Sequence, residues 1–289
     1  MMRKFALCMV AMLSLAVAAF AQNGSAANAG VTDSTAALSM LQPDTIALSD
    51  SVTQSAELTL GEPESFRRKS SPYKFKPLQL IAPVALIGVG IIGLESDWLK
   101  YQNSEIRDEL QEHGEHKFTV DNLSQYSPIA ATYALNLLGV KGKHGYADLT
   151  IILGTAYALM APTVYGLKSI TKVKRPDGST ANSFPSGHTA TAFLGAEILR
   201  REYWDVSPWI GVAGYAVAAG TGFLRIYNNR HWLTDVIGGA GVGILAAQAA
   251  YWLYPWISKT FFHKQYLKNT YLSPYVGSDS KGLSCVIRF

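Results

Sequence analysis

The sequence predicts an all-α protein: a six-helix membrane-associated bundle with a disordered N-terminal leader and a short C-terminal tail or strand. Two observations lead to this prediction. Of the 289 residues, 48% are hydrophobic and only 16% are charged, which suits helices that are apolar on most faces. From Leu78 onward, apolar segments alternate with polar connections, which is typical of a helical bundle.

Six apolar segments are the candidate core helices. They are residues 78–94, 127–140, 149–167, 188–199, 207–224 and 236–257. A helix that spans a bilayer needs about 20 apolar residues, with roughly 17 as a lower limit. The segments that meet this length are 78–94, 149–167 and 236–254. The segment 188–199 does not, because Glu197, Arg200 and Arg201 interrupt or follow it.

The N-terminal region divides into a signal and a leader. Residues 1–21 have a basic start, an apolar core and the small-residue sequence Ala19-Phe20-Ala21, a pattern that predicts a secretory signal peptide. An uncleaved anchor helix is the alternative. Residues 22–63 contain no Lys, Arg or His and have no sustained apolar periodicity, which predicts a disordered leader.

The leader ends in a basic segment, and the chain ends in a short tail. The segment "SFRRKSSPYKFKP" mixes five basic residues with aromatic ones, which suits either an anionic membrane surface or a solvated linker. The C-terminal "GLSCVIRF" alternates with a period of two, so it predicts a strand or an irregular tail. The expected divisions are a signal at 1–21, a leader at 22–76, a helical domain at 77–258 and a tail at 259–289.

Three polar stretches lie at the ends of the predicted helices. They are Lys168 with Arg175, the sequence Pro185-Ser186-Gly187-His188, and Arg225 with His231 and Asp235. If the helices pack antiparallel, all three stretches fall at the same end of the bundle. Helical bundles assemble sites in this way.

The first feature of this expected site is its positive charge. Holding Lys168, Arg175 and Arg225 together without an anion costs Coulomb repulsion. Arginine pairs bidentately with a tetrahedral oxyanion, and lysine adds a point charge. The N–H groups around Ser186, Gly187 and His188 add donors at a helix start. The sequence therefore predicts a site for phosphate or a phosphate isostere.

The second feature is a pair of histidines. His231 and Asp235 are four residues apart, so they share one helical face if the helix begins before His231. A carboxylate on one imidazole nitrogen leaves the other nitrogen free as a nucleophile or base. His188 is then available as a general acid. The spacings of a zinc site and an Asp-rich cation loop are absent from the sequence, so we expect no metal and no cofactor.

Taken together, the three motifs resemble the type 2 phosphatidic acid phosphatase and vanadium-dependent haloperoxidase superfamily over roughly residues 78–256. The matching stretches are "KSITKVKRP" (168–176), "PSGH" (185–188) and "RIYNNRHWLTD" (225–235). The resemblance implies a phosphate site formed by Lys168, Arg175, Ser186, Gly187 and Arg225. It also implies that His231, oriented by Asp235, attacks phosphorus to form a phosphohistidine while His188 protonates the leaving group.

One position departs from the family pattern. Members usually have a small hydroxyl residue before the third-motif arginine, whereas this chain has Leu224. One neutral hydrogen bond is worth about 0.5–1.5 kcal/mol net, so we expect altered rather than abolished activity. The neighbouring Arg230 is an additional base that either contacts substrate or faces solvent.

The substrate and location follow from the resemblance and the charge pattern. The resemblance implies a bacterial membrane phosphatase similar to those acting on lipid A or phosphatidylglycerol phosphate, with a lipid phosphate as partner. After signal removal, six full spans would put Lys168 inside the cell. The basic stretches at 67–76, 141–143, 200–201 and 259–268 favour the opposite orientation. We expect a site that faces the periplasm, in the cell envelope.

Other functions stay open at this point. Transfer of the phosphoryl or head group to an alcohol, vanadate-dependent halide oxidation and non-catalytic phosphate binding all use the same pocket. A complete set of His188, His231 and Asp235 favours catalysis, because binding alone needs no oriented imidazole. The formal net charge of +4 is too small to indicate nucleic acid as a partner. The oligomeric state does not follow from the sequence.

Overall fold

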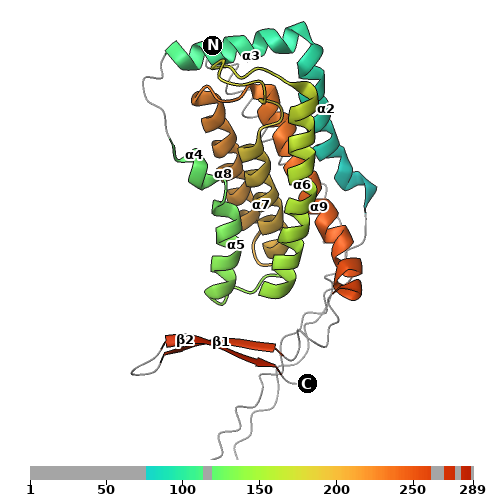
Figure 1. Cartoon of the computed structure of the whole chain (residues 1–289), viewed down its shortest axis with the longest axis vertical. Helices are drawn as coiled ribbons and strands as arrows, with labels where there is room; N and C mark the ends of the chain where they lie inside the picture. Colours follow the sequence, from blue (N-terminus) through green and yellow to red (C-terminus); the bar gives the residue numbers. More distant parts are fainter. Residues whose placement is uncertain (1–75, 113–118, 262–269, 277–280, 288–289) are drawn as a thin grey trace, which may run out of the picture.

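The computed structural model describes residues 76–112, 119–261, 270–276 and 281–287. These residues are predominantly helical, as the sequence predicts (Figure 1). The elements in chain order are η1 (Pro77–Leu80), α2 (Ile81–Glu95), α3 (Asp97–Glu112), α4 (Asp121–Ser124), α5 (Ser127–Leu137), α6 (Tyr146–Thr171), α7 (Gly187–Tyr203), α8 (Pro208–Tyr227), α9 (Leu233–Thr260), β1 (Thr270–Val276) and β2 (Lys281–Ile287). The predicted signal and almost all of the leader lie outside the described residues.

Helix α7 is the centre of the bundle. All of its residues from Thr189 to Tyr203 are buried, and α5, α6, α8 and α9 pack against it. The main apolar cluster joins α6, α7 and α9 through side chains such as Leu149, Ile152, Leu194 and Val242. Burying one such side chain is worth about 1.5–3 kcal/mol. The rest of α7 is buried in the bundle, and this packing fixes the position of its first turn, where His188 lies.

Glycines in α9 let two other helices approach its backbone. A Cβ at Gly243 would lie 2.1 Å from the carbonyl oxygen of Ala190 in α7. A Cβ at Gly241 would lie 2.6 Å from the carbonyl oxygen of Pro83 in α2. Neither distance is compatible with a side chain, so α9 fits between α2 and α7 only because these positions lack one.

The helices alternate in direction, so the predicted polar stretches meet at one end. Ser186 at the start of α7 donates its backbone N–H to Asp235 O in the first turn of α9, at 3.0 Å. Lys168 in the last turn of α6 reaches the loop that precedes α7. Figure 1 shows α3 crossing this end of the bundle. The antiparallel arrangement expected from the sequence is confirmed.

The helix count and the candidate spans differ from the prediction. The six expected core helices correspond to α2, α5, α6, α7, α8 and α9, and the described residues add α3 and the short α4. Four helical stretches are long and apolar enough to cross a membrane: 77–95, 146–171, 208–227 and 233–260. The third of these was not among the predicted spans. Helix α8, Pro208–Tyr227, has 20 residues and is apolar enough over its length to be such a candidate.

The placement of Arg200 and Arg201 corrects the charge argument for orientation. Both side chains are buried inside the bundle, with exposed fractions of 6% and 4%. Arg200 Nε donates to Glu197 Oε2 at 2.8 Å, and Arg201 Nε donates to Glu197 Oε1 at 2.6 Å. These arginines are therefore not loop charges, and they do not count toward the basic bias that favours one orientation.

The C-terminal region contains a two-stranded antiparallel ladder. Thr270 pairs with Ile287, and Val276 pairs with Lys281. Strand β2 covers most of the segment whose period of two predicts a strand, and β1 pairs with it. The sequence did not predict β1.

Candidate active site

His231 lies in the turn that leads from α8 into α9, beside Asp235 in the first turn of α9. Helix α8 ends at Tyr227 and α9 begins at Leu233. The helix begins after His231, so the condition for a shared helical face is not met. The pair forms because the backbone N–H of His231 donates to Arg225 O at 3.2 Å, which turns the chain back. Asp235 Oδ2 lies 3.5 Å from His231 Nδ1 and also accepts the N–H of Trp232 at 2.9 Å.

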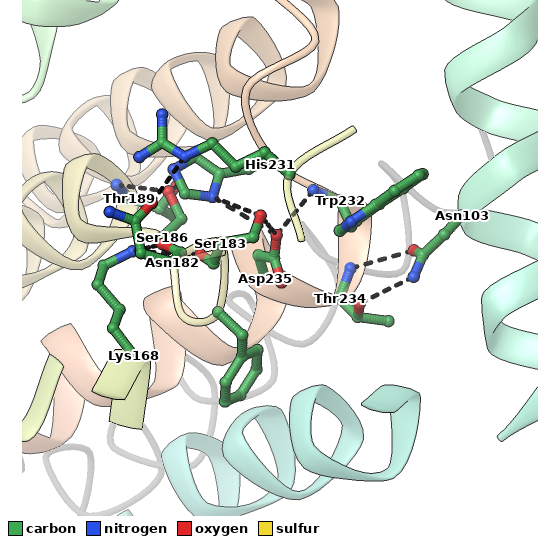
Figure 2. A network of polar contacts seen from close by, with 12 residues as sticks. Asn103, Lys168, Asn182, Ser183, Ser186, Thr189, His231, Trp232, Thr234 and Asp235 are labelled. Carbon is green, nitrogen blue, oxygen red and sulfur yellow. Dashed lines mark hydrogen bonds and ion pairs between the residues drawn. The ribbon is translucent and has the colours of Figure 1, made fainter. Parts of the chain in front are cut away.

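Ser183 is a third member of this contact, and the sequence analysis missed it. Its hydroxyl donates to Asp235 Oδ2 at 2.5 Å and lies 3.4 Å from His231 Nδ1. Ser183 is fully buried. Figure 2 shows its side chain beside Asp235, below the His231 ring. Its position two residues before the P-S-G-H motif was the only available signal.

The surroundings of His231 favour its neutral form. The side chain is 2% exposed. Its pKa is lowered to about 4, mainly by burial. Asp235 raises this pKa, and Arg225 lowers it. A neutral ring whose Nδ1 faces Asp235 has its lone pair on Nε2, since the two nitrogens of a neutral imidazole divide the donor and acceptor roles.

Ser186 caps α7. Its side-chain oxygen accepts from Thr189, at 2.9 Å from the hydroxyl and 3.5 Å from the backbone N–H. Its own N–H is used by Asp235 O, so Ser186 has fewer donors for an anion than the sequence suggests. Gly187 and His188 follow as the first two helical residues, where backbone N–H groups have no acceptor within the helix. A helix start of this kind favours an anion.

His188 contacts a residue that lies far from it in the sequence. Its Nε2 is 2.9 Å from Asn122 Oδ1 in α4. Burial and the positive charge of Arg225 lower the pKa of His188 to about 4. Asp121 raises it, while His231 and Arg175 lower it further. The charged groups close enough to act on His188 therefore include His231, Arg175 and Arg225.

Lys168 and Arg175 share one neutral partner, Asn182. Lys168 Nζ donates to the backbone oxygens of Asn182 at 2.5 Å and Ser183 at 3.2 Å. Arg175 Nε donates to Asn182 Oδ1 at 3.0 Å. Burial and the nearby Arg225 lower the pKa of Arg175. Both cations thus reach the loop before α7, and neither has a carboxylate as its hydrogen-bond partner there.

Arg225 has a carboxylate partner, which the sequence analysis also missed. Its Nη1 donates to Asp121 Oδ2 at 2.5 Å, and both side chains are buried. Its Nε is buried with no hydrogen-bond partner among the described residues. Since Asp121 occupies one edge of the guanidinium, the edge formed by Nε and Nη2 keeps the bidentate geometry that matches a tetrahedral oxyanion.

Two residues beside the site are not part of this arrangement. Arg230 pairs with Asp177 at 3.0 Å, and its side chain is 42% exposed, which fits the solvent-facing alternative. Leu224 is partly buried and offers no hydrogen-bonding side chain. No group of three or more His, Cys, Asp and Glu able to hold a metal occurs among the described residues.

Comparison with known proteins finds a similarity to one family over part of the chain. Residues 145–259 match the family model described as the PAP2 superfamily. The lipid A 1-phosphatase of Porphyromonas gingivalis is 45% identical over 135 residues, which are 46% of this chain and 30% of that protein. The chain thus aligns with less than a third of the length of this curated relative.

Two solved structures also resemble the chain. The crystal structure of Aquifex aeolicus LpxE is 20% identical, with a TM-score of 0.35, and the match covers 61% of this chain and 87% of the other. The crystal structure of a transmembrane PAP2 type phosphatidylglycerolphosphate phosphatase from Bacillus subtilis is 18% identical, with a TM-score of 0.38. The match covers 63% of this chain and 98% of the other.

Proposed function

We propose, from the match of residues 145–259 to the PAP2 superfamily model and from the geometry of the site, that the protein is a metal-independent phosphatase that hydrolyses a phosphomonoester or diphosphate of a membrane lipid. The observation that carries the proposal is the arrangement around His231. A buried, neutral imidazole faces a carboxylate with one nitrogen, at the end of the bundle where three cations meet. Phosphate binding alone does not require such an oriented base.

In the proposed reaction His231 is the nucleophile. Its Nε2 lone pair attacks phosphorus, and the bond between phosphorus and the lipid oxygen breaks. The departing oxygen takes a proton from His188, which gives the lipid alcohol. Lys168, Arg175, Arg225 and the N–H groups at the start of α7 bind the phosphoryl oxygens and stabilise their charge in the transition state.

The second half of the reaction uses His188 as a base. Neutral His188 takes a proton from water, the water oxygen attacks the phosphohistidine, and the phosphorus–nitrogen bond breaks. Inorganic phosphate leaves, and His188 is protonated again. The protein's own groups lower the pKa of His188 to about 4, burial being the largest cause. A bound phosphate dianion raises this pKa, because a nearby negative charge favours the imidazolium form.

The membrane is the proposed source of the substrate. The site lies at the end of four helices that are long and apolar enough to cross a bilayer, so a lipid head group reaches it without leaving the interface. The relative from Porphyromonas gingivalis is named a lipid A 1-phosphatase, which supports lipid A as the first substrate to test.

The proposed location is the bacterial envelope, with the site facing the periplasm. The signal pattern at residues 1–21 supports export. Lys141 and Lys143, both exposed between α5 and α6, support a cytoplasmic position for the opposite end. A membrane-impermeant maleimide applied to intact cells should label Ser179→Cys, near the site, and not Lys141→Cys. The reverse labelling would refute this orientation.

The nucleophile is tested with His231→Asn, because the asparagine amide keeps a polar group near the position of Nδ1 but provides no Nε2. We expect phosphate release from a short-chain phosphatidate and from lipid A to fall below detection, while the melting temperature in detergent is retained. Activity of the unsubstituted protein should be unchanged by a chelator. Substantial activity in His231→Asn would show that His231 is not the nucleophile.

A further inference from the structure

Asn122 lies outside the residues that match the family model, but it contacts His188, the proposed general acid. The family match begins at residue 145, whereas Asn122 belongs to α4, and its Oδ1 is 2.9 Å from His188 Nε2. It is separated from His188 by 66 residues. We propose that Asn122 is a positioning residue for catalysis, which accepts the Nε2–H of His188 and so turns Nδ1 toward the leaving group. This inference rests on the proposed function of His188.

Contacts on both sides of Asn122 fix its position. Asp121 is 2% exposed and pairs with Arg225 of α8. Ser124 Oγ lies 2.8 Å from Thr221 Oγ1, also in α8. The backbone oxygen of Asn122 accepts from Gln125 Nε2 at 2.9 Å. The amide therefore comes from a segment that is attached to the bundle before any ligand binds, as a positioning group requires.

The chemistry of the contact determines what Asn122 does. An amide oxygen accepts a hydrogen bond from Nε2–H in both the neutral and the protonated ring. It therefore assigns the second, transferable proton to Nδ1. Without it, the protonated ring would have an Nε2–H with no protein acceptor in a half-buried position, which disfavours the charged form.

Other charges also act on His188, and they must be separated from this effect. They are Asp121 in α4, Arg225 in α8, Arg175 in the loop before α7 and His231 in the turn before α9. Arg225, Arg175 and His231 oppose protonation, and Asp121 favours it. Substitutions at Asn122 leave all four groups in place.

Leaving groups of different basicity provide the test. Hydrolysis of a diacylglycerol phosphate such as dioctanoyl phosphatidate needs a proton on the departing alkoxide oxygen, whereas p-nitrophenyl phosphate releases a stable phenolate. Removing a general acid costs about 10²–10⁴-fold. His188→Gln should therefore lower kcat/KM, which reports formation of the phosphohistidine, by that amount for phosphatidate and far less for p-nitrophenyl phosphate. The role of His188 as a base in the second half is common to both substrates and affects their kcat instead.

Asn122→Leu and Asn122→Asp then examine the positioning role in the full-length protein. We expect Asn122→Leu to lower kcat/KM for phosphatidate about tenfold, which corresponds to one hydrogen bond to a charged group, and for p-nitrophenyl phosphate less than twofold. Asn122→Asp keeps the acceptor and adds a negative charge. It should retain phosphatidate activity and move the alkaline limb of its pH profile to higher pH.

Ser124→Ala is the matched control, because it loosens the same short helix without touching His188 or Arg225. It should change both substrates equally. Equal losses on both substrates in Asn122→Leu would overturn the inference and give α4 a purely structural role. Loss of phosphatidate activity in Asn122→Asp would also overturn it, because the amide would then act as a donor. If the unsubstituted protein hydrolyses neither substrate, or His188→Gln changes neither, the proposed function itself fails.

Discussion

Two groups of charged residues in this bundle are built in opposite ways. The first is the Glu197 network, formed by Glu197, Arg200, Arg201 and Tyr215 inside the bundle. Glu197 accepts two hydrogen bonds from Arg200 at 2.8 Å each, one from Arg201 at 2.6 Å and one from the Tyr215 hydroxyl at 2.7 Å. The second group is the candidate active site at one end of the bundle, called here the active-site end, with Lys168, Arg175 and Arg225.

The difference lies in the partners that the chain provides. In the Glu197 network the carboxylate is bound by two guanidiniums and a hydroxyl from the protein itself. At the active-site end, Lys168 and Arg175 bind neutral oxygens of the loop before α7, and Arg225 has Asp121 on one edge only. A cation whose hydrogen-bond partners are neutral keeps its full charge, so Lys168 and Arg175 can still attract an anion. The first group therefore satisfies its charges within the protein, whereas the second has the arrangement that the proposed phosphate site requires.

Of the substitutions that test this comparison, Glu197→Ala is expected to change the free energy of unfolding most. Removing one member of a buried ion pair leaves uncompensated charge and costs about 3–5 kcal/mol. We expect the free energy of unfolding in detergent to fall by that amount, while the molecules that stay folded bind vanadate with unchanged affinity. An unchanged melting temperature would show that Arg200 and Arg201 are stabilised by other contacts.

Arg175→Ala should have the reverse profile. A hydrogen bond to a charged group contributes about 1.5–3 kcal/mol, so the Kd for vanadate should rise about 10- to 100-fold. The free energy of unfolding should not fall, because the substitution also removes repulsion from Arg225. Lys174→Ala is the control, since it removes an exposed cation from the same loop. Equal effects of both substitutions would mean that the loop attracts anions only by its total charge.

The sequence was sufficient for the helical bundle and for the convergence of its polar stretches. Apolar periodicity locates each helix, and alternating direction then brings Lys168, His188 and His231 to one end. It was insufficient for Arg200 and Arg201, because a cation that follows an apolar segment looks the same whether it faces solvent or a buried carboxylate three or four residues earlier.

The missed site residues have a common cause. Asp121 and Asn122 act on Arg225 and His188 across separations of 104 and 66 residues, and no local pattern encodes such contacts. Ser183 was closer to a motif, but its role depends on Asp235 in another helix. Even the His231–Asp235 pair, although predicted, forms through a turn before α9 rather than on a helical face.

The smallest expected effect is a change of folding stability with pH. It distinguishes the two groups because the active-site end contains two histidines and the Glu197 network contains none. His231 and His188 have pKa values of about 4 in the folded protein, below the ordinary value near 6.5. Between these values the unfolded chain binds more protons, so stability is complete above about pH 6.5 and decreases as the pH falls toward 4.

For His231 alone this loss amounts to about 2 kcal/mol between pH 7 and pH 5. Thermal unfolding of the anion-free protein in detergent should show it as a decrease in melting temperature. His231→Asn should make the dependence shallower. Glu197→Ala should instead lower the curve with little change of slope between pH 7 and pH 5, because Glu197 is largely ionised in both the folded and the unfolded chain over that range. Bound vanadate should also reduce the slope, since it favours the protonated form of His188. If His231→Asn kept the full slope, the acid sensitivity would come from elsewhere, and burial of a neutral His231 would not explain it.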